Sequence, residues 1–157
     1  ARTRAMEAFC ASSWARSSST VESRPASSAW SAARVSASRT SAAECSASRV
    51  AVREFYSFHF GNDMRVSAEG LKARTKFLTP ELLKRIEGAG EGTDRFTTGT
   101  DDLPKAFRAD ECRVLSPERT ELDVLLFWKD DTRTEQKKIK VQTVRKGEQW
   151  LVDEVIR

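Results

Sequence analysis

The chain has 157 residues, of which 39% are hydrophobic and 32% are charged, and its formal net charge is +4. The basic excess lies mostly at the N-terminus: residues 1–48 hold 6 Arg against 3 Glu, whereas the other 109 residues hold 21 basic and 20 acidic side chains. A balanced domain lacks the clustered basic surface that nucleic acids require, so we expect no nucleic-acid partner. No apolar run approaches the length of about 18 residues that a membrane span needs, and we expect none.

Residues 1–48 differ in composition from the rest of the chain. They contain 14 Ser, 13 Ala and 6 Arg, and they lack Leu, Ile, Lys and Gly. Such a segment offers too little apolar area to offset its ordering entropy, so we expect a disordered tail that is dispensable for folding, followed by one domain over residues 49–157. Two other origins stay open for the tail: translation in the wrong frame or upstream of the true start, and a transit peptide. We expect no export signal in it, because it has no apolar run of about 7 to 15 residues.

Three amphipathic helices are predicted at the start of the domain. The first has apolar side chains at helical spacing and ends near Gly61. Its buried stripe comprises Val52, Phe55, Tyr56, His59 and Phe60. Ser67 is placed to cap a second helix that extends to Phe77. Thr79-Pro80-Glu81 is a start signal for a third, which Gly88 should end.

A long ordered loop and four strands are predicted after these helices. The glycines of the loop, which covers residues 88–104, follow a helix and lead to no helix, so they do not form a phosphate-binding loop. The strands are expected at 106–115, at about 120–129, at 138–146 and around Trp150 and Val152. The second strand has apolar side chains on both faces and should be central. This order predicts an α+β fold in which three N-terminal helices cover the concave face of a curved four-stranded antiparallel sheet.

Five short motifs occur in an order that resembles the bacterial domain of unknown function 3828. They are Arg53-Glu54-Phe55-Tyr56, Phe77-Leu78-Thr79-Pro80-Glu81-Leu82, Asp94-x-Phe96-Thr97, Pro104-x-x-Phe107-Arg108 and Gly147-x-x-Trp150-x-Val152-Asp153. The layout of that family is similar to the cone-shaped fold of nuclear transport factor 2 and ketosteroid isomerase. The resemblance covers most of residues 50–157. It implies a cone-like fold and, for some members, an exported or lipid-anchored location in the bacterial envelope, and it implies no established reaction.

Metal and cofactor sites are not indicated by the sequence. Cys10, Cys45 and Cys112 show no metal-ligand spacing, and His59 is the single histidine, so the four ligands of a structural zinc site cannot be assembled. We expect no metal and no cofactor. Cys112 falls among strand residues, and we interpret it as a buried apolar filler.

The candidate pocket and binding residues are Tyr56, His59, Arg108, Trp128 and Asp153. His59 is either a proton acceptor facing a cavity or a core histidine with a satisfied ring, and we favour the second. Arg108 either recognises a ligand or pairs with Asp110 on the same strand face, and we favour the pair. Tyr56 and Trp128 are interpreted as core aromatic residues, although a phenol inside a cone is able to donate to a ligand oxygen.

The function that these observations favour is a non-enzymatic bacterial domain that binds a small ligand or a protein partner. No catalytic residues are assigned under this reading, and a homodimer stays open. The alternative is a cavity enzyme of the isomerase or dehydratase type, with His59 as base and Tyr56 or Asp153 beside it. Such an enzyme needs a pocket of roughly 300 Å³ or more with converging polar groups. A binding module needs no such cavity, because its interior can be filled by Phe55, Phe77, Leu126 and Trp128.

Overall fold

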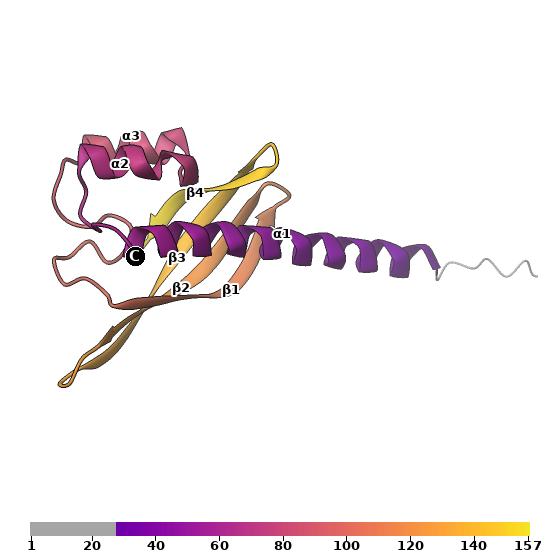
Figure 1. Ribbon diagram of the computed structural model, residues 1–157. Coiled ribbons are helices and arrows are strands. Elements are labelled where there is room, and N and C mark those ends of the chain that lie inside the picture. Colours follow the sequence, from indigo (N-terminus) through magenta and orange to yellow (C-terminus); the bar gives the residue numbers. More distant parts are fainter. Residues whose placement is uncertain (1–27) are drawn as a thin grey trace, which may run out of the picture.

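The computed structural model describes the backbone of residues 28–157 and the side chains of residues 41–157. Its elements are α1 (Ser28–Phe60), α2 (Ala68–Arg74), the short 3-10 helix η1 (Thr75–Phe77), α3 (Pro80–Gly88), β1 (Ala106–Ser116), β2 (Arg119–Lys129), β3 (Thr134–Lys146) and β4 (Gln149–Ile156). Figure 1 shows these elements. The predicted α+β class, with three α-helices before four antiparallel strands, is confirmed for this part of the chain.

The four strands form an antiparallel meander in the order β1-β2-β3-β4. β2 is therefore central, as its two apolar faces predicted, and its register with β3 runs from Arg119 opposite Val144 to Lys129 opposite Thr134. β3 begins at Thr134 rather than at the predicted Lys138. The reason is a tight turn, in which the Asp130 amide donates to the Arg133 carbonyl over 3.0 Å, so that strand pairing resumes at once.

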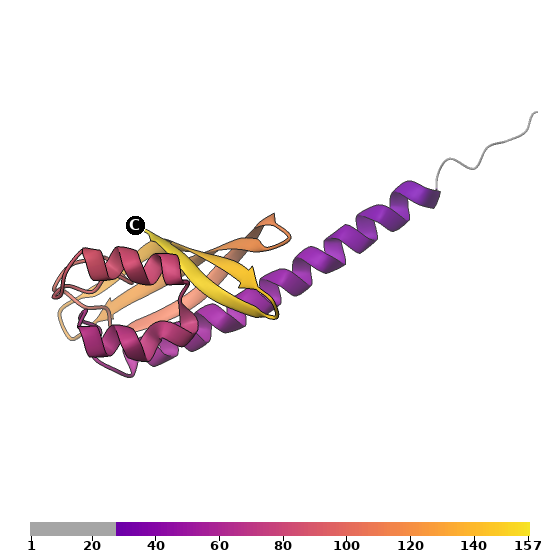
Figure 2. The ribbon, with the colours of Figure 1, turned by 90° about the horizontal axis from the view of Figure 1, so that it is seen from above.

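The core lies between α1 and the sheet, which α1 crosses on one face (Figures 1 and 2). The predicted stripe of α1 contributes Val52, Phe55, Tyr56 and His59, each with no exposed surface. From β2 the alternating residues Thr120, Leu122, Val124, Leu126 and Trp128 are buried. Because full burial of each large apolar side chain contributes about 1.5–3 kcal/mol, this layer provides much of the driving force for folding.

The predicted helix starts are confirmed by their capping bonds. Ser67 Oγ accepts a hydrogen bond from the Gly70 amide over 3.1 Å, and Thr79 Oγ1 accepts one from the Leu82 amide over 3.2 Å. Each bond satisfies an amide that the first turn of a helix leaves without a backbone partner. α3 ends at Gly88, as predicted, and the predicted second helix is present as α2 followed by η1.

The prediction of a disordered tail up to residue 48 is wrong for the described residues. α1 is continuous from Ser28 through residue 49 to Phe60, and its N-terminal part extends away from the sheet (Figure 2). Ser48 has no exposed surface. The Ser/Ala-rich composition was misleading because alanine has the highest helix propensity and small side chains allow a helix to lie close to a sheet. Residues 1–27 lie outside the described part, so the expectation for them is untested.

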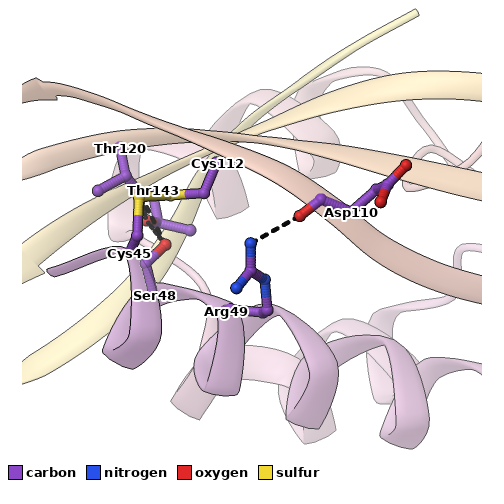
Figure 3. Close-up of a disulfide and its surroundings, with 7 residues drawn as sticks. All are labelled: Cys45, Ser48, Arg49, Asp110, Cys112, Thr120 and Thr143. Atoms are coloured by element: carbon purple, nitrogen blue, oxygen red, sulfur yellow. Dashed lines mark hydrogen bonds between the residues drawn. A yellow bond between two sulfur atoms is a disulfide. The ribbon is translucent and has the colours of Figure 1, made fainter. Parts of the chain in front are cut away.

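A disulfide joins Cys45 of α1 to Cys112 of β1 (Figure 3). The interpretation of Cys112 as an apolar filler is therefore wrong. The two cysteines are 67 residues apart in sequence, and only the docking of α1 on β1 brings them together. Close by, Arg49 Nη2 donates to the Asp110 carbonyl over 2.8 Å. The disulfide and this hydrogen bond both hold α1 to the edge strand of the sheet.

Three buried hydroxyl groups form a closed ring one turn along α1 from the disulfide. Ser48 Oγ lies 2.5 Å from Thr120 Oγ1 and 2.8 Å from Thr143 Oγ1, and the two threonine oxygens are 2.8 Å apart (Figure 3). Each hydroxyl has one proton to donate and lone pairs to accept with, so three bonds satisfy all three groups. The ring connects α1 to β2 and β3 without leaving an unpaired polar group in the core.

Removing these contacts should destabilise the fold. The double variant Cys45→Ala/Cys112→Ala should lower the free energy of unfolding by about 2–5 kcal/mol, because the unfolded chain regains the entropy that a long closed loop removes. Ser48→Ala should cost about 1–2 kcal/mol, because Thr120 and Thr143 each lose a partner. Urea denaturation of the full chain under non-reducing conditions measures both.

A chain that starts at residue 49 should show both losses together, whereas a chain that starts at residue 41 should keep both contributions. Equal denaturation midpoints for these two chains would contradict the role assigned to the first turns of the docked helix.

Candidate functional site

His59 lies in the middle of a buried hydrogen-bonded chain that also contains Arg74 and Asp94. Its imidazole has no exposed surface. Arg74 Nε donates to His59 Nδ1 over 3.1 Å, and His59 Nε2 lies 3.1 Å from both carboxylate oxygens of Asp94. Because Nδ1 accepts from the guanidinium, the ring proton sits on Nε2 and is donated to Asp94. Both ring nitrogens are engaged within the protein, and neither is free to take a proton from a ligand.

Arg74 is held in the interior by main-chain oxygens as well as by the imidazole. It is 2% exposed, and it donates to the carbonyls of Gly70 and Asp63 over 2.8 and 2.5 Å. Burial lowers the pKa of Arg74, and the negative charges of Asp94 and Asp63 oppose that shift. A side chain at position 70 would force the guanidinium to shift, since a Cβ there would lie 2.9 Å from Arg74 Nη1. Gly70 therefore makes room for the guanidinium.

Asp94 provides the negative charge that balances Arg74. It has no exposed surface, and it accepts hydrogen bonds from the Phe96 amide over 2.7 Å and from Thr97 Oγ1 over 2.6 Å. Burial alone would raise its pKa, but hydrogen bonds from His59, Thr97 and the Phe96 amide outweigh this effect and hold the pKa below its ordinary value. Asp94 is thus an anion at neutral pH, and the buried charges compensate across the neutral ring.

Tyr56 extends the same network toward the loop that contains Phe96. Its hydroxyl donates to the Phe96 carbonyl over 2.7 Å, and its ring centroid lies 6.3 Å from that of His59. Burial raises the pKa of Tyr56 well above its ordinary value, and the charge of Asp94 adds to the rise. The phenol therefore remains protonated, and its hydroxyl is engaged as a hydrogen-bond donor to the loop.

Trp128 lies elsewhere in the core, near the turn between β2 and β3. It is 3% exposed, and its indole nitrogen donates to the Asp102 carbonyl over 3.2 Å. The charged groups of Arg133 and Lys137 lie 5.5 and 5.3 Å from its ring centroid. These contacts attach the loop and the start of β3 to the core.

Arg108 and Asp153 lie on the sheet, where each has its own partners. Arg108 pairs with Asp110 at 3.8 Å, with both side chains largely exposed, which is the arrangement that the sequence favoured. Asp153 accepts from Thr79 Oγ1 over 2.8 Å and pairs with Arg119 at 3.0 Å. Of the five candidate site residues, the structure brings Tyr56 and His59 into contact, while Arg108, Trp128 and Asp153 engage other groups.

Two hollows on the described surface adjoin each other beside α1. We call them the α1 groove, and their volumes are about 480 and 580 Å³. They share Val50 and Glu54 of α1 with Lys76 and Phe77 of η1. The far wall is formed by Glu148, Gln149, Trp150 and Leu151, at the turn into β4. Sequence reasoning did not point to this groove, because its walls come from three segments that only the fold brings together.

The α1 groove is lined by six apolar and six polar or charged residues. Val50 is 53% exposed, which is unusual for a large apolar side chain in a compact domain. The ammonium of Lys76 lies 4.7 Å from the ring centroid of Phe77. Glu54 also lines both hollows. The charged side chains of the lining are Arg53, Glu54, Lys76 and Glu148, so the groove combines apolar surface with charges of both signs.

No group of three or more His, Cys, Asp or Glu side chains within residues 41–157 could hold a metal ion. Among the described helices, none is long and apolar enough to cross a membrane.

Sequence reasoning missed Arg74 and Asp94, the partners of the imidazole. Asp94 had a local signal, because an aspartate whose side chain accepts from the next residue but one is typical of a turn, and the motif Asp94-x-Phe96-Thr97 fits it. Arg74 had none, because an arginine in a short amphipathic helix is expected to face solvent.

Asp94→Asn should lower the free energy of unfolding at pH 7 by about 2–4 kcal/mol, because the amide leaves Arg74 without a counter-charge and turns an N–H toward a donor. The folded pKa of Asp94 is depressed, so its stabilisation is complete above the ordinary pKa of a carboxyl and is lost as pH falls through the folded value. The difference in the free energy of unfolding between wild type and Asp94→Asn should therefore become smaller below about pH 4. Urea titrations from pH 7 to pH 3 measure it.

Asp130→Asn is the matched control, since Asp130 accepts similar bonds from Thr132 in an exposed turn. It should change stability little at any pH. A gap for Asp94→Asn that stays constant down to pH 3 would contradict the assignment of an ionised, buried carboxylate.

Comparisons with known proteins extend the description of the fold. No family model and no curated protein matches the chain. The structure is similar to the crystal structure of a protein of unknown function from Bacteroides thetaiotaomicron, with a TM-score of 0.55 and 22% sequence identity. The match covers 81% of this chain and 99% of that one. At this identity the likeness bears on the fold alone.

Proposed function

We propose that the domain is a non-enzymatic binding module of the bacterial envelope, which takes a small ligand or a protein partner in the α1 groove. The proposal includes the cone-like arrangement implied by the resemblance to the domain of unknown function 3828, with the helices over the concave face of the sheet. It includes no nucleic-acid partner, because the basic and acidic side chains of the domain are nearly equal in number.

The observation that carries this proposal is that three side chains capable of acid–base chemistry lie in the core and do not line the α1 groove. His59, Asp94 and Tyr56 are buried and hydrogen-bonded to one another or to the main chain. The α1 groove, in contrast, is open to solvent and is lined by apolar and by charged side chains. A general base must come within hydrogen-bond reach of its substrate, whereas a binding site needs shape and apolar area.

The filling of the interior supports the same choice over an isomerase or dehydratase. Phe55, Leu126 and Trp128 are buried in one cluster, and Phe77 packs against it. These are the side chains expected to fill the cone in a binding module. An enzyme of the alternative type would need a lined cavity in the position that these side chains occupy.

The disulfide supports an envelope location. Disulfides form and persist in oxidising compartments such as the bacterial periplasm, and they are rare in the cytosol, where thiols are kept reduced. The Cys45–Cys112 bond connects the first helix to the sheet, so it contributes to the stability of the fold. A protein that relies on such a bond is suited to the periplasm or to a secreted setting.

Val50→Glu should weaken binding in the α1 groove without unfolding the domain, because Val50 is already 53% exposed. The probe is 8-anilinonaphthalene-1-sulfonate. Its aromatic rings suit the apolar side chains of the groove, and its sulfonate suits the ammonium of Lys76. We expect its apparent affinity to fall by about fivefold or more, as apolar contact is lost and a negative charge is added. Fluorescence titration measures it.

Leu115→Glu is the matched control, because Leu115 is a similarly exposed apolar residue at 49% and lies at the end of β1, outside the groove. Its affinity for the dye should stay within twofold of wild type, on the order of the error of such titrations. Equal weakening in both variants, or no binding by wild type, counts against the groove.

His59→Gln tests the enzyme alternative. Gln cannot both accept from Arg74 and donate to Asp94 in the geometry of the ring, so we expect the free energy of unfolding to fall by about 1–3 kcal/mol. Binding of the dye by the folded protein should be unchanged. A small-molecule screen by thermal shift accompanies this test, and a compound that stabilises wild type and not His59→Gln would favour the enzyme.

A further inference from the structure

We propose a second binding site, separate from the α1 groove, that takes a carboxylate attached to a short apolar group. It is a small cleft between α3, the loop at residues 89–105 and β4. We call it the arginine cleft, because Arg85, Arg95 and Arg157 line it together with one acidic residue, Glu154. The proposal goes beyond the proposed function and does not depend on it.

The floor of the arginine cleft is apolar and its volume is small. The floor is formed by Leu82, Ile86, Ala89 and Val155. The cleft encloses about 170 Å³. Because sites for drug-sized molecules occupy roughly 300–1,000 Å³, this cleft has room only for a short chain or a single side chain. A bare inorganic anion would leave the apolar floor without contact.

Charge in the cleft is unbalanced in a way that calls for an anion. Arg85 has a carboxylate partner, since its Nη1 lies 3.4 Å from Glu154 Oε1. Arg95 and Arg157 instead donate to neutral main-chain carbonyls. No ion pair joins either of them to an acidic side chain of the described residues. The side chains that line the cleft therefore carry three positive charges against one negative charge, and a bound anion would reduce the repulsion between the guanidinium groups.

The guanidinium groups of Arg95 and Arg157 are held in place before any ligand arrives. Arg157 donates to the Thr97 carbonyl over 2.9 Å and to the Arg95 carbonyl over 2.7 Å. Gly99, at φ 75°, leaves the space that Arg157 occupies, since a Cβ there would lie 3.1 Å from the guanidinium carbon. Arg95 donates to the Ala89 carbonyl over 3.1 Å. Fixed donors lose little side-chain entropy when an anion binds, which favours affinity.

Arg95 lines the cleft with a side chain that is only partly buried, although its Nε is shielded from solvent and has no hydrogen-bond partner among the described residues. The guanidinium fork matches a carboxylate in two-point geometry, and the apolar floor beside it suits the carbon chain of a fatty acid or the last side chain of a peptide.

Titration with butyrate tests the proposal on the full chain with its disulfide intact. Saturation-transfer NMR at low, fixed ionic strength reports binding, and butylamine serves as the cationic probe of the same shape. We expect butyrate to bind, butylamine not to bind, and Arg95→Gln to weaken butyrate by about tenfold, as loss of one charged donor does. Arg145→Gln is the control, because Arg145 also donates to a main-chain carbonyl, that of Gly147, away from the cleft. It should leave butyrate binding unchanged.

The remaining measurements decide between outcomes. If Arg95→Gln does not fold, Arg85→Gln replaces it, because that side chain is 53% exposed and its loss leaves Glu154 to repel an anion. A short peptide with a free C-terminus, compared with its amidated form, shows whether the carboxylate comes from a peptide end or from a free acid, and binding of either supports the site. No binding of butyrate, equal binding of inorganic phosphate, or equal weakening by Arg145→Gln would overturn the proposal.

Discussion

The imidazole of His59 joins α1 to two segments outside the four-stranded sheet, which are themselves paired only by the short β-bridge between Val66 and Gly92. Through Nδ1 it is bonded to Arg74 at the end of α2, and through Nε2 to Asp94 in the loop between α3 and β1. Because the ring and both partners are buried, water does not compete for these bonds, and each is stronger than it would be at the surface. A protein can keep a cation and an anion in its core only if they are paired and fully hydrogen-bonded, and the neutral ring between them meets that condition.

Both proposed binding sites depend on this buried chain of bonds. Fixing the end of α2 fixes η1, which carries Lys76 and Phe77 into the wall of the α1 groove. Fixing the loop through Asp94 positions the carbonyls of Arg95 and Thr97, which in turn hold Arg157 in the arginine cleft. The histidine therefore acts as a positioning residue for surfaces that it does not touch. At the other end of the docked helix, the disulfide and the ring of hydroxyls around Ser48 complete the attachment of α1 to the sheet.

Features set by local sequence could be predicted, and features set by distant partners could not. The cap at Thr79 and the central position of β2 follow from nearby residues, because a capping oxygen acts within one turn and a strand shows its burial in its own alternation. The sequence does not predict that α1 begins before residue 49, because the Ser/Ala-rich turns of the helix carry no apolar stripe. The stretch at residues 45–48 is attached to the sheet by Cys45 and Ser48, whose partners lie 67 to 95 residues away in the sequence. The same distinction applies to the candidate site. The sequence indicates that His59 is a core residue, but it does not indicate that Arg74 and Asp94 are the hydrogen-bond partners of its imidazole.

The arrangement separates the residues able to do acid–base chemistry from the surfaces able to meet a ligand. In an enzyme these coincide, since a proton can be transferred only across a hydrogen bond to the substrate. Here the acid–base groups are His59, Asp94 and Tyr56, and all three form hydrogen bonds within the protein, to α2 or within the loop. These bonds stabilise the segments that line the α1 groove and the arginine cleft. A rigid interior of this kind favours binding, because walls that are already ordered lose little entropy when a partner arrives. The same rigidity would hinder a reaction, since exposing His59 would require breaking its bonds to both Arg74 and Asp94 and leaving two opposite charges buried without their bridge.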